Sequence, residues 1–141
     1  MSRYIREGRQ LTYDGAAFAL AAAVAKAREI GIPENVSVVD AGGNLLAFGR
    51  MDGAKFLAQH SSFTKARTAA SLAMPTGHFP AQFGVDLALA TGEQSINLPG
   101  GLPIILNGEL LGAVGVSSGA DDQDVIIAEA ACDAVLSALK T

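Results

Sequence analysis

Apolar and small side chains recur at helical spacing in three long segments, residues 12–30, 56–73 and 122–139. The first segment begins at Thr12, whose hydroxyl can cap a helix, and ends where Gly31 and Pro33 interrupt helical backbone. The second ends before Pro75, since a proline disfavours helical backbone at the residue before it. We therefore predict three helices. Phe18 lies on one face of the first, and alanines on the opposite side indicate a helix covered on both sides.

Strand-forming residues occur in two pairs of short runs, residues 36–40 with 45–50 and residues 103–106 with 110–117. The first pair is joined by residues 41–44, whose two glycines suit a tight turn with positive φ. The second pair flanks Asn107 and Gly108, a favourable dipeptide for a hairpin turn. Both pairs therefore predict β-hairpins.

The pattern weakens between residues 75 and 97, where prolines and glycines interrupt it. We expect loop in this region with a short helix near residues 85–90, and a strand at residues 95–98 stays open as an alternative. Hairpins separated by helices are typical of the α+β class, in which helices cover an antiparallel sheet. We predict a single domain of this class over residues 1–141.

The composition adds an expectation about assembly. Apolar residues make up 50% of the 141 residues and charged residues 17%, and so few charges are unusual for the surface of a monomer. We therefore expect a homo-oligomer, either a dimer or a larger assembly. A net charge of −4 and a pI near 5.0 leave no basic patch for a phosphate backbone, so no nucleic-acid partner is expected.

Targeting and redox signals are weak. Residues 1–7 lack the apolar core of a signal peptide, and no apolar run is long enough to cross a bilayer. We expect a cytoplasmic protein with no membrane partner. Cys132 lies in an apolar helical pattern and is expected to be a buried hydrophobe rather than a reactive thiol.

Charged residues occur where the first predicted hairpin ends and the next helix begins. Arg50 ends a strand, Asp52 precedes the helix, and Lys65 lies a few turns along it. We expect these three to converge on one pocket. Arg50 and Lys65 would pair with a ligand carboxylate, and Asp52 would act as a catalytic acid or base. Alternatively, Asp52 caps the helix and Arg50 is its ion-pair partner.

Histidines are the strongest candidates for ligating a haem iron. His60 shares a predicted helix face with Phe56, Phe63 and Arg67, and His78 lies in a segment rich in proline and glycine. We take His60 as a candidate ligand-binding residue. The alternative is an ordinary core histidine.

A stretch rich in glycine and proline runs from Leu98 to Gly119. Its spacing fits neither a phosphate-binding loop nor a dinucleotide fingerprint. Backbone amides around Gly100, Gly101 and Ser117 could bind an anion or stabilise an oxyanion. The alternative is that these residues only form turns.

Three aspartates, Asp121, Asp122 and Asp124, stand at the start of the last predicted helix. Asp121 and Asp124 could be taken for a metal-binding pair. We favour Asp121 as the helix cap, with Asp122 and Asp124 interacting with the helix dipole. No metal site is predicted.

Six segments in fixed order carry a resemblance to a known family: residues 38–43, 50–54, 65–66, 98–104, 112–117 and 123–124. Together they resemble the GlcG/HbpS-like family, whose members are labelled haem-degrading or haem-binding. The resemblance implies a profilin-like three-layer α/β/α fold with a five-stranded antiparallel sheet, and dimers or larger assemblies. It also implies haem or another tetrapyrrole as a candidate ligand. Haem-binding relatives often use ligands near the first helix, where Tyr13 is the conventional ligand type in this chain.

Three functions stay open. The first is a small-molecule-binding protein, with haem or another tetrapyrrole as the ligand that the resemblance implies. The second is a cofactor-independent enzyme that acts by proton transfer on a small carboxylate or oxygenated catabolic intermediate. The third is an accessory or assembly subunit.

Overall fold

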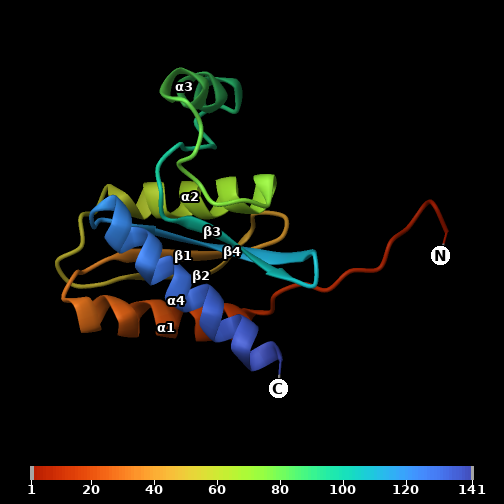
Figure 1. Cartoon of the computed structure of the whole chain (residues 1–141), viewed down its shortest axis with the longest axis horizontal. Helices are drawn as coiled ribbons and strands as arrows, with labels where there is room; N and C mark the ends of the chain where they lie inside the picture. The colour runs from red at the N-terminus through yellow and green to blue at the C-terminus, as the bar shows by residue number, and fades with distance from the viewer. Residues whose placement is uncertain (1, 141) are drawn as a thin grey trace.

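A four-stranded antiparallel sheet with helices on both faces forms the body of the computed structural model, which describes residues 2–140 (Figure 1). The helices are α1 (Tyr13–Ile30), α2 (Ala58–Leu72), α3 (Ala81–Ala90) and α4 (Asp121–Leu139). The strands are β1 (Asn35–Asp40), β2 (Leu45–Arg50), β3 (Gly101–Leu106) and β4 (Glu109–Ser117), in the order β2-β1-β4-β3. The α+β class with an antiparallel sheet is therefore confirmed. Met1, which belongs to the N-terminal segment considered above as a signal peptide, lies outside the described residues.

Both hairpins form as predicted. In the turn between β1 and β2, one carboxylate oxygen of Asp40 accepts hydrogen bonds from the backbone amides of Gly42 at 2.9 Å and Asn44 at 3.0 Å. In the turn between β3 and β4, Asn107 and Gly108 have φ angles of 51° and 80°. Two positive φ values at the centre of a two-residue loop suit the right-handed twist of the paired strands.

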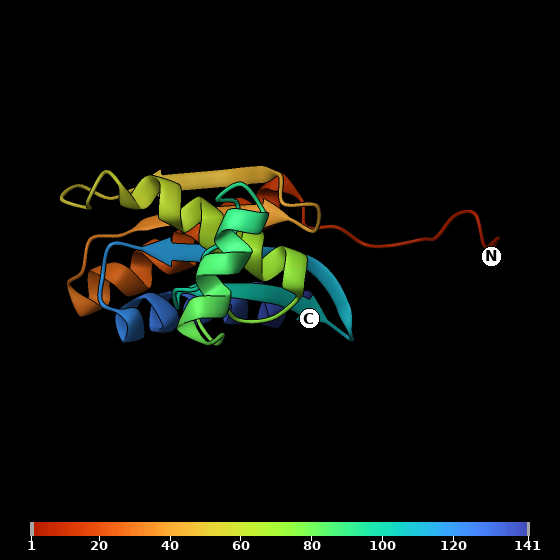
Figure 2. The ribbon, with the colours of Figure 1, turned by 90° about the horizontal axis from the view of Figure 1, so that it is seen from above.

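Alternating side chains of the central strands face two separate cores. Val36 and Val38 of β1, with Val114 and Val116 of β4, pack against α1 and α4. On the other face, the core beneath α2 is made of small residues: Val39, Ala66, Ala69, Ala70 and Ala113. In Figures 1 and 2, α2 lies on one face of the sheet while α1 and α4 lie on the other.

The buried face of α1 differs from the one expected. Its fully buried residues are Ala16, Ala19, Ala23 and Ala27, because alanines allow the helix to lie close to the sheet and to α4. Phe18 is 51% exposed instead. The helix ends as predicted, since the Thr12 hydroxyl accepts a hydrogen bond from Gly15 N at 3.0 Å and Gly31 adopts a left-handed conformation.

The expected fifth strand is absent from residues 2–140, so that prediction was wrong. Residues 95–98 form no strand, because side-chain hydroxyls bind their backbone groups in place of a neighbouring strand. Thr68 Oγ1 accepts a hydrogen bond from Ile96 N at 3.1 Å, and Thr76 Oγ1 donates to the carbonyl oxygen of Leu98.

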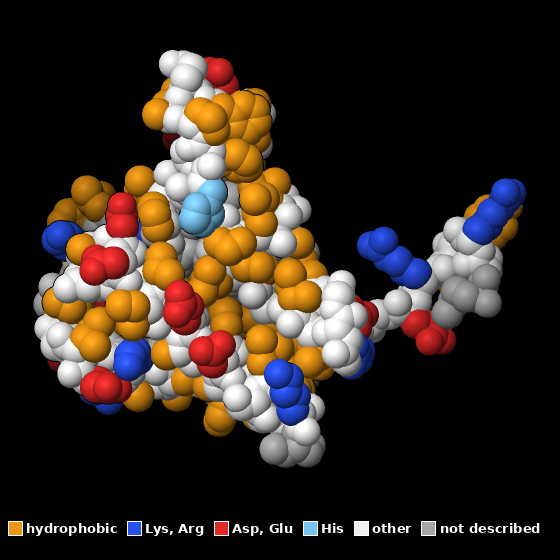
Figure 3. All heavy atoms as spheres, viewed as in Figure 1, with side chains coloured by type: hydrophobic (Ala, Val, Ile, Leu, Met, Phe, Trp, Pro, Cys, Tyr) orange, Lys and Arg blue, Asp and Glu red, His pale blue; other side chains and the backbone are white. Residues whose placement is uncertain are grey.

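Helix α3 stands apart from the sheet. It begins four residues earlier than predicted, its only buried residue is Gly84, and it has no extensive contact with another described helix or strand. Figures 1 and 3 show it as a projection beyond α2. A Cβ on Gly84 would stand 2.6 Å from Cβ of Asn97, so this glycine lets the helix lie against the returning chain.

Two glycines of the Leu98–Gly119 stretch allow α2 to approach the sheet closely. A Cβ on Gly115 would collide with the carbonyl oxygen of Ser62, and a Cβ on Gly101 would collide with that of Lys65. Backbone of α2 therefore touches backbone of β3 and β4. This close approach sets the depth at which the side chains of α2 meet the sheet.

Replacing Gly115 by alanine tests this close packing. We expect Gly115→Ala to lower the free energy of unfolding by about 2–3 kcal/mol, because α2 must move away from the sheet to admit the methyl group. Urea denaturation would measure the change. Gly8→Ala is the matched control, since its Cβ would make only an ordinary 3.4 Å contact with Glu109; an equally small effect of both substitutions would contradict the interpretation.

Candidate active site

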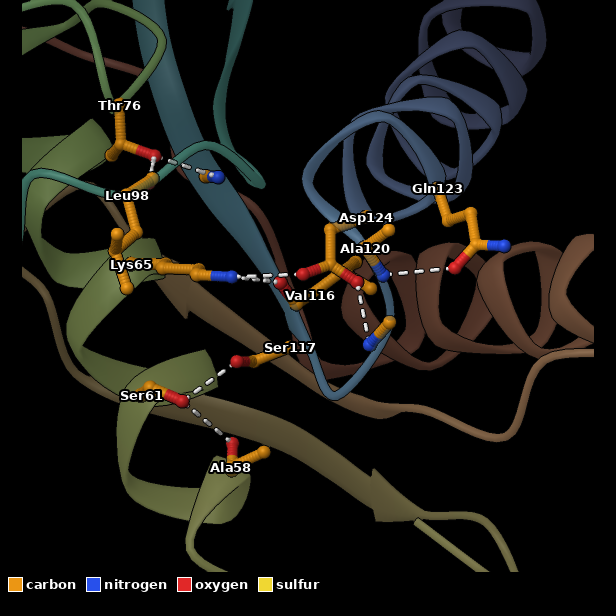
Figure 4. A network of polar contacts seen from close by, with 12 residues as sticks. Ala58, Ser61, Lys65, Thr76, Leu98, Val116, Ser117, Ala120, Gln123 and Asp124 are labelled. Carbon is orange, nitrogen blue, oxygen red and sulfur yellow. Dashed lines mark hydrogen bonds and ion pairs between the residues drawn. The ribbon is translucent and has the colours of Figure 1, made fainter. Parts of the chain in front are cut away.

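A buried ion pair joins α2 to the start of α4. The ammonium group of Lys65 donates to Asp124 Oδ2 at 3.0 Å and to the carbonyl oxygen of Val116 in β4 at 2.9 Å (Figure 4). Both charged side chains are only 3% exposed. The pair thus connects α2, β4 and α4 at one end of the sheet.

The other carboxylate oxygen of Asp124 organises the loop before α4. Asp124 Oδ1 accepts a hydrogen bond from Gly119 N at 3.0 Å, and Gln123 Oε1 accepts one from Ala120 N at 2.8 Å. Ala120, not Asp121, is the N-cap residue. The predicted roles of Asp121 as a cap and of Asp124 as a dipole partner are therefore corrected, because the α4 turn directs Asp124 inward to Lys65.

A second carboxyl group lies beside this pair. Glu34 comes immediately before β1 and is 0% exposed. Among the described residues, no N–H or O–H donor lies in hydrogen-bond geometry with either of its carboxyl oxygens. Its Oε2 and Asp124 Oδ1 both face Gly119, at 3.0 Å and 2.9 Å from the place where a Cβ of that glycine would stand. Gly119 therefore leaves the space in which the two carboxyl groups meet.

Burial raises the pKa of Glu34 from 4.5 to about 9, and Asp124 adds to the rise, first as an acceptor for the proton of Glu34 and then through its negative charge. The Gly119 amide and the Lys65 ammonium oppose this rise in pKa without cancelling it. Glu34 is therefore a neutral acid at pH 7. A neutral Glu34, a carboxylate on Asp124 and an ammonium on Lys65 leave the cluster with no net charge.

A cleft of about 670 Å³ lies over the ion pair, and both Lys65 and Asp124 line it. Its apolar walls come from three exposed side chains, Phe56, Leu57 and Leu98. A volume of this size is in the usual range for small-molecule sites, about 300–1,000 Å³.

Hydroxyl groups add a polar strip to the same cleft. Ser61 of α2 and Ser117 of β4 share a hydrogen bond of 2.6 Å, and Ser118 accepts one from Lys55 N at 3.0 Å. Figure 4 shows the Ser61–Ser117 pair one turn of α2 away from Lys65. Because an ammonium has three N–H donors and two of those of Lys65 are engaged within the chain, one is left for a ligand oxygen.

The structure does not bring Arg50 and Asp52 to the cleft of Lys65. They line a different cleft of about 440 Å³, together with Val24, Arg28 and Met51. The reason is topological, because β2 is the edge strand farthest from β3, while Lys65 lies over β3 and β4. The expected convergence of the three charged residues is thus not found within this chain.

The remaining candidates are distributed over several places. His60 and His78 are exposed and line none of the four clefts described here. Gly101 N already donates to Thr76 Oγ1 at 2.9 Å, and a Cβ on Gly100 would stand 3.1 Å from Lys65 Nζ. These two glycines make room for Lys65, whereas Ser117 does line the cleft.

Sequence reasoning missed Glu34 as a member of the site and misassigned Asp124. A charged residue directly before an apolar strand is usually exposed, so Glu34 carried only the weak signal of its position beside the run at residues 36–39. Asp124 resembled the other acidic residues of the first helical turn, and only the tertiary fold separates it from them.

Residues 2–140 contain no group of three or more His, Cys, Asp or Glu side chains that could hold a metal ion. Their helices include none that is both long and apolar enough to cross a membrane.

The fold and site define a class: an antiparallel sheet between helices, with a buried lysine–carboxylate cluster under a ligand-sized cleft. Over residues 11–133 the sequence matches the family described as "Haem degrading protein HbpS-like", and the chain belongs to that family.

Relatives in sequence support this membership. The 15.0 kDa protein of the dhaT-dhaS intergenic region of Citrobacter freundii is 44% identical over 114 residues, which cover 77% of this chain and 80% of that protein. Protein GlcG of Escherichia coli K12 is 39% identical over 84 residues, which cover 59% of this chain and 63% of GlcG. The match thus spans slightly less than two thirds of GlcG.

Solved structures show the same fold. Klebsiella pneumoniae protein ORFY has a TM-score of 0.90 at 36% identity, and the alignment covers 96% of this chain and 97% of ORFY. The PduOC:haem complex has a TM-score of 0.81 at 27% identity, and the alignment covers 89% of this chain and 94% of PduOC. A double mutant of Streptomyces reticuli HbpS has a TM-score of 0.82 at 30% identity, and the alignment covers 94% of this chain and 92% of HbpS.

The protonated state of Glu34 predicts a particular dependence of stability on pH. Because the pKa of Glu34 is raised in the folded protein, the stability it contributes is fully present below about pH 4.5 and is lost as the pH rises through about 9. Glu34→Gln cannot ionise. We therefore expect the free energy of unfolding of the variant, relative to wild type, to increase steadily between about pH 5 and about pH 9.

Urea denaturation across this pH range would measure the difference. Glu29→Gln, at an exposed position of α1, is the control and should follow wild type throughout. Parallel curves for Glu34→Gln and wild type would show that Glu34 does not hold its proton in the folded state.

Proposed function

We propose that the chain is a small-molecule-binding protein whose ligand occupies the Lys65 cleft and carries an oxygen that accepts the remaining N–H of Lys65. The observation that carries this proposal is a nearly buried lysine with a donor to spare at the floor of a ligand-sized cleft. Membership of the HbpS-like family, with haem-complex PduOC and HbpS as structural neighbours, supports a haem or small-molecule binding role.

The lining of this cleft favours a small oxygenated compound over haem. A hydroxyl pair, Ser61 and Ser117, can exchange hydrogen bonds with ligand hydroxyl or carboxylate oxygens. The side-chain types that ligate haem iron in proteins are His, Cys, Met and Tyr, and the lining of the Lys65 cleft includes none of them. This chemistry is suited to a small carboxylate or hydroxy compound, the class expected for a catabolic intermediate.

Binding of glycolate, pyruvate and hydroxyacetone, measured by calorimetry, tests the proposal. The double variant Lys65→Met/Asp124→Leu removes the cation together with its partner, so that no unpaired charge stays buried. We expect it to bind at least tenfold more weakly than wild type, because a hydrogen bond from a charged donor contributes about 1.5–3 kcal/mol.

Arg67→Gln is the matched control, since Arg67 lies on the same helix but lines another cleft. The control should bind like wild type. Equal affinity of the double variant and wild type for every bound compound would place the ligand elsewhere.

The cleft of Arg50 and Asp52 is a second candidate site, with haem as its ligand. Met51 is the only residue of an iron-ligating type in the linings of the four clefts described here, and Arg28 and Arg50 beside it could pair with propionates. The buried Cys132 fits this role poorly, because burial raises the pKa of its thiol to about 12. A haem bound in this cleft would be held by Met51, Arg28 and Arg50.

A haem titration followed at the Soret band separates the iron ligands. We expect a saturable, shifted band in wild type, a changed band position in Met51→Leu, and weaker saturation in Arg50→Gln. His60→Ala should behave like wild type if the Met51 cleft is used. Loss of the Soret band in His60→Ala alone would indicate that haem binds at the exposed face of α2 instead.

Self-association remains a prediction, and α3 is the surface that favours it most. Three of its large apolar side chains, Phe83, Val85 and Leu89, are at least 50% exposed. Figure 3 shows apolar side chains gathered on this projection. Exposed apolar surface of this kind is typical of contacts between proteins.

A further inference from the structure

The carboxyl groups beside Lys65 go beyond what ligand binding requires. Lys65 alone would supply the N–H donor, yet the fold also buries Asp124 and, next to it, Glu34, whose carboxyl oxygens no described N–H or O–H donor reaches. Burying charged or unpaired polar groups costs free energy that apolar residues of similar size would not. Groups buried at such a cost beside a cleft are candidates for chemistry.

We infer that Asp124 and Lys65 form an acid–base site for small carbonyl compounds bearing a second oxygen, such as α-hydroxy or α-oxo compounds, and that Glu34 tunes Asp124. This inference rests on the proposed binding of an oxygen-bearing ligand in the Lys65 cleft. It replaces Asp52, which lines the other cleft, as the acid or base.

The reaction is a proton transfer at the carbon next to the carbonyl group. Asp124 takes the proton as the C–H bond breaks, the electron pair of that bond forms a C=C bond, and the carbonyl π pair moves onto oxygen. The ammonium of Lys65 stabilises the enolate oxygen by a charged hydrogen bond. The proton on Asp124 then exchanges with solvent, and delivery of the solvent-derived proton to carbon completes exchange. Delivery of the proton to the enolate oxygen instead gives the enol, so neither outcome needs an oxidant or cofactor.

Glu34 acts through Asp124 and is therefore a positioning residue. The groups that face it are Asp124 and Gln123 of α4, the Gly119 amide of the preceding loop, and Lys65 of α2. While Glu34 is protonated it adds no charge, and Asp124 is the only carboxylate of the buried cluster. Once Glu34 ionises, a second negative charge lies next to Asp124 and attracts the proton that is transferred.

The charges and size of the cleft define the substrate class. Asp121 and Asp124 both line the cleft, so a phosphorylated dianion would meet two carboxylates and is disfavoured. A neutral or singly charged compound could place its carbonyl oxygen on Lys65 and its second oxygen on the Ser61–Ser117 hydroxyls. The exposed apolar walls then cover a short carbon chain.

Deuterium incorporation from D₂O into hydroxyacetone, dihydroxyacetone and pyruvate, followed by proton NMR, tests the site. General acid–base groups contribute about 10²–10⁴-fold to a rate, so we expect exchange by Asp124→Asn to be at least a hundredfold slower than by wild type. Arg67→Gln should exchange at the wild-type rate. Thermal unfolding of each variant shows whether it is folded at the assay temperature.

Glu34→Gln supplies a second readout, the pH profile of exchange, since glutamine mimics the protonated acid. After the buffer rate at each pH is subtracted, we expect the exchange rate of wild type to rise as the pH passes about 9, and this rise to be absent from Glu34→Gln. A rise that persists in the variant would exclude Glu34 from the site.

Calorimetry with the same three compounds separates this inference from the proposed function. Binding that depends on Lys65 without exchange above the buffer rate would overturn the acid–base site and leave the binding function intact. Exchange that persists in folded Asp124→Asn would overturn it as well. Absence of both binding and exchange would remove the two together.

Discussion

The ion pair between Lys65 and Asp124 is the interaction on which the arrangement of this protein depends. A charge so deeply buried is stable only where its partner lies within hydrogen-bond distance, so α2, β4 and the first turn of α4 must keep their relative positions. The close approach of α2 to the sheet allows this. Gly101 and Gly115 remove the side chains that would separate them, and Gly100 leaves room for the ammonium itself.

Glu34 gives this ion pair its electrostatic character. Three titratable groups lie together, but burial keeps Glu34 protonated, so the cluster holds one carboxylate and one ammonium at neutral pH. That balance lets the cluster remain buried without net charge. It also places a protonated carboxyl group beside Asp124, which lines a cleft, so one feature bears on both stability and the proposed chemistry.

The two clefts suit different ligands because different parts of the sheet form them. The Lys65 cleft lies at the end of β4, between side chains of α2 and the first turn of α4, and its hydroxyl groups and single free donor suit a small oxygenated compound. The Arg50 cleft lies at the outer strand beside α1, where two arginines and Met51 are suited to an anionic ligand. One neighbour of the same fold, PduOC, has been solved in complex with haem.

Local signals in the sequence determined most of the elements. Helix α1 begins after Thr12 and ends before Gly31, Asn107-Gly108 forms the turn between β3 and β4, and the apolar runs identify the paired strands. These features depend on the backbone preferences of neighbouring residues. The resemblance to the family also came from short motifs. Contacts between distant residues could not be predicted from such local signals. For this reason the sequence left a strand open at residues 95–98, whose backbone instead forms hydrogen bonds with the side chains of Thr68 and Thr76.

The site shows the same division. Lys65 and Ser117 could be selected as candidates from their residue types and positions, but nothing local distinguishes Asp124 from Asp121 or marks Glu34 as buried. The tertiary structure alone decided that Arg50 and Lys65 lie over different strands, and that Lys65 meets a carboxylate 59 positions further along the chain. The physical reason is that burial and charge pairing depend on which surfaces the folded sheet and helices bring together, whereas turns and caps depend on adjacent residues.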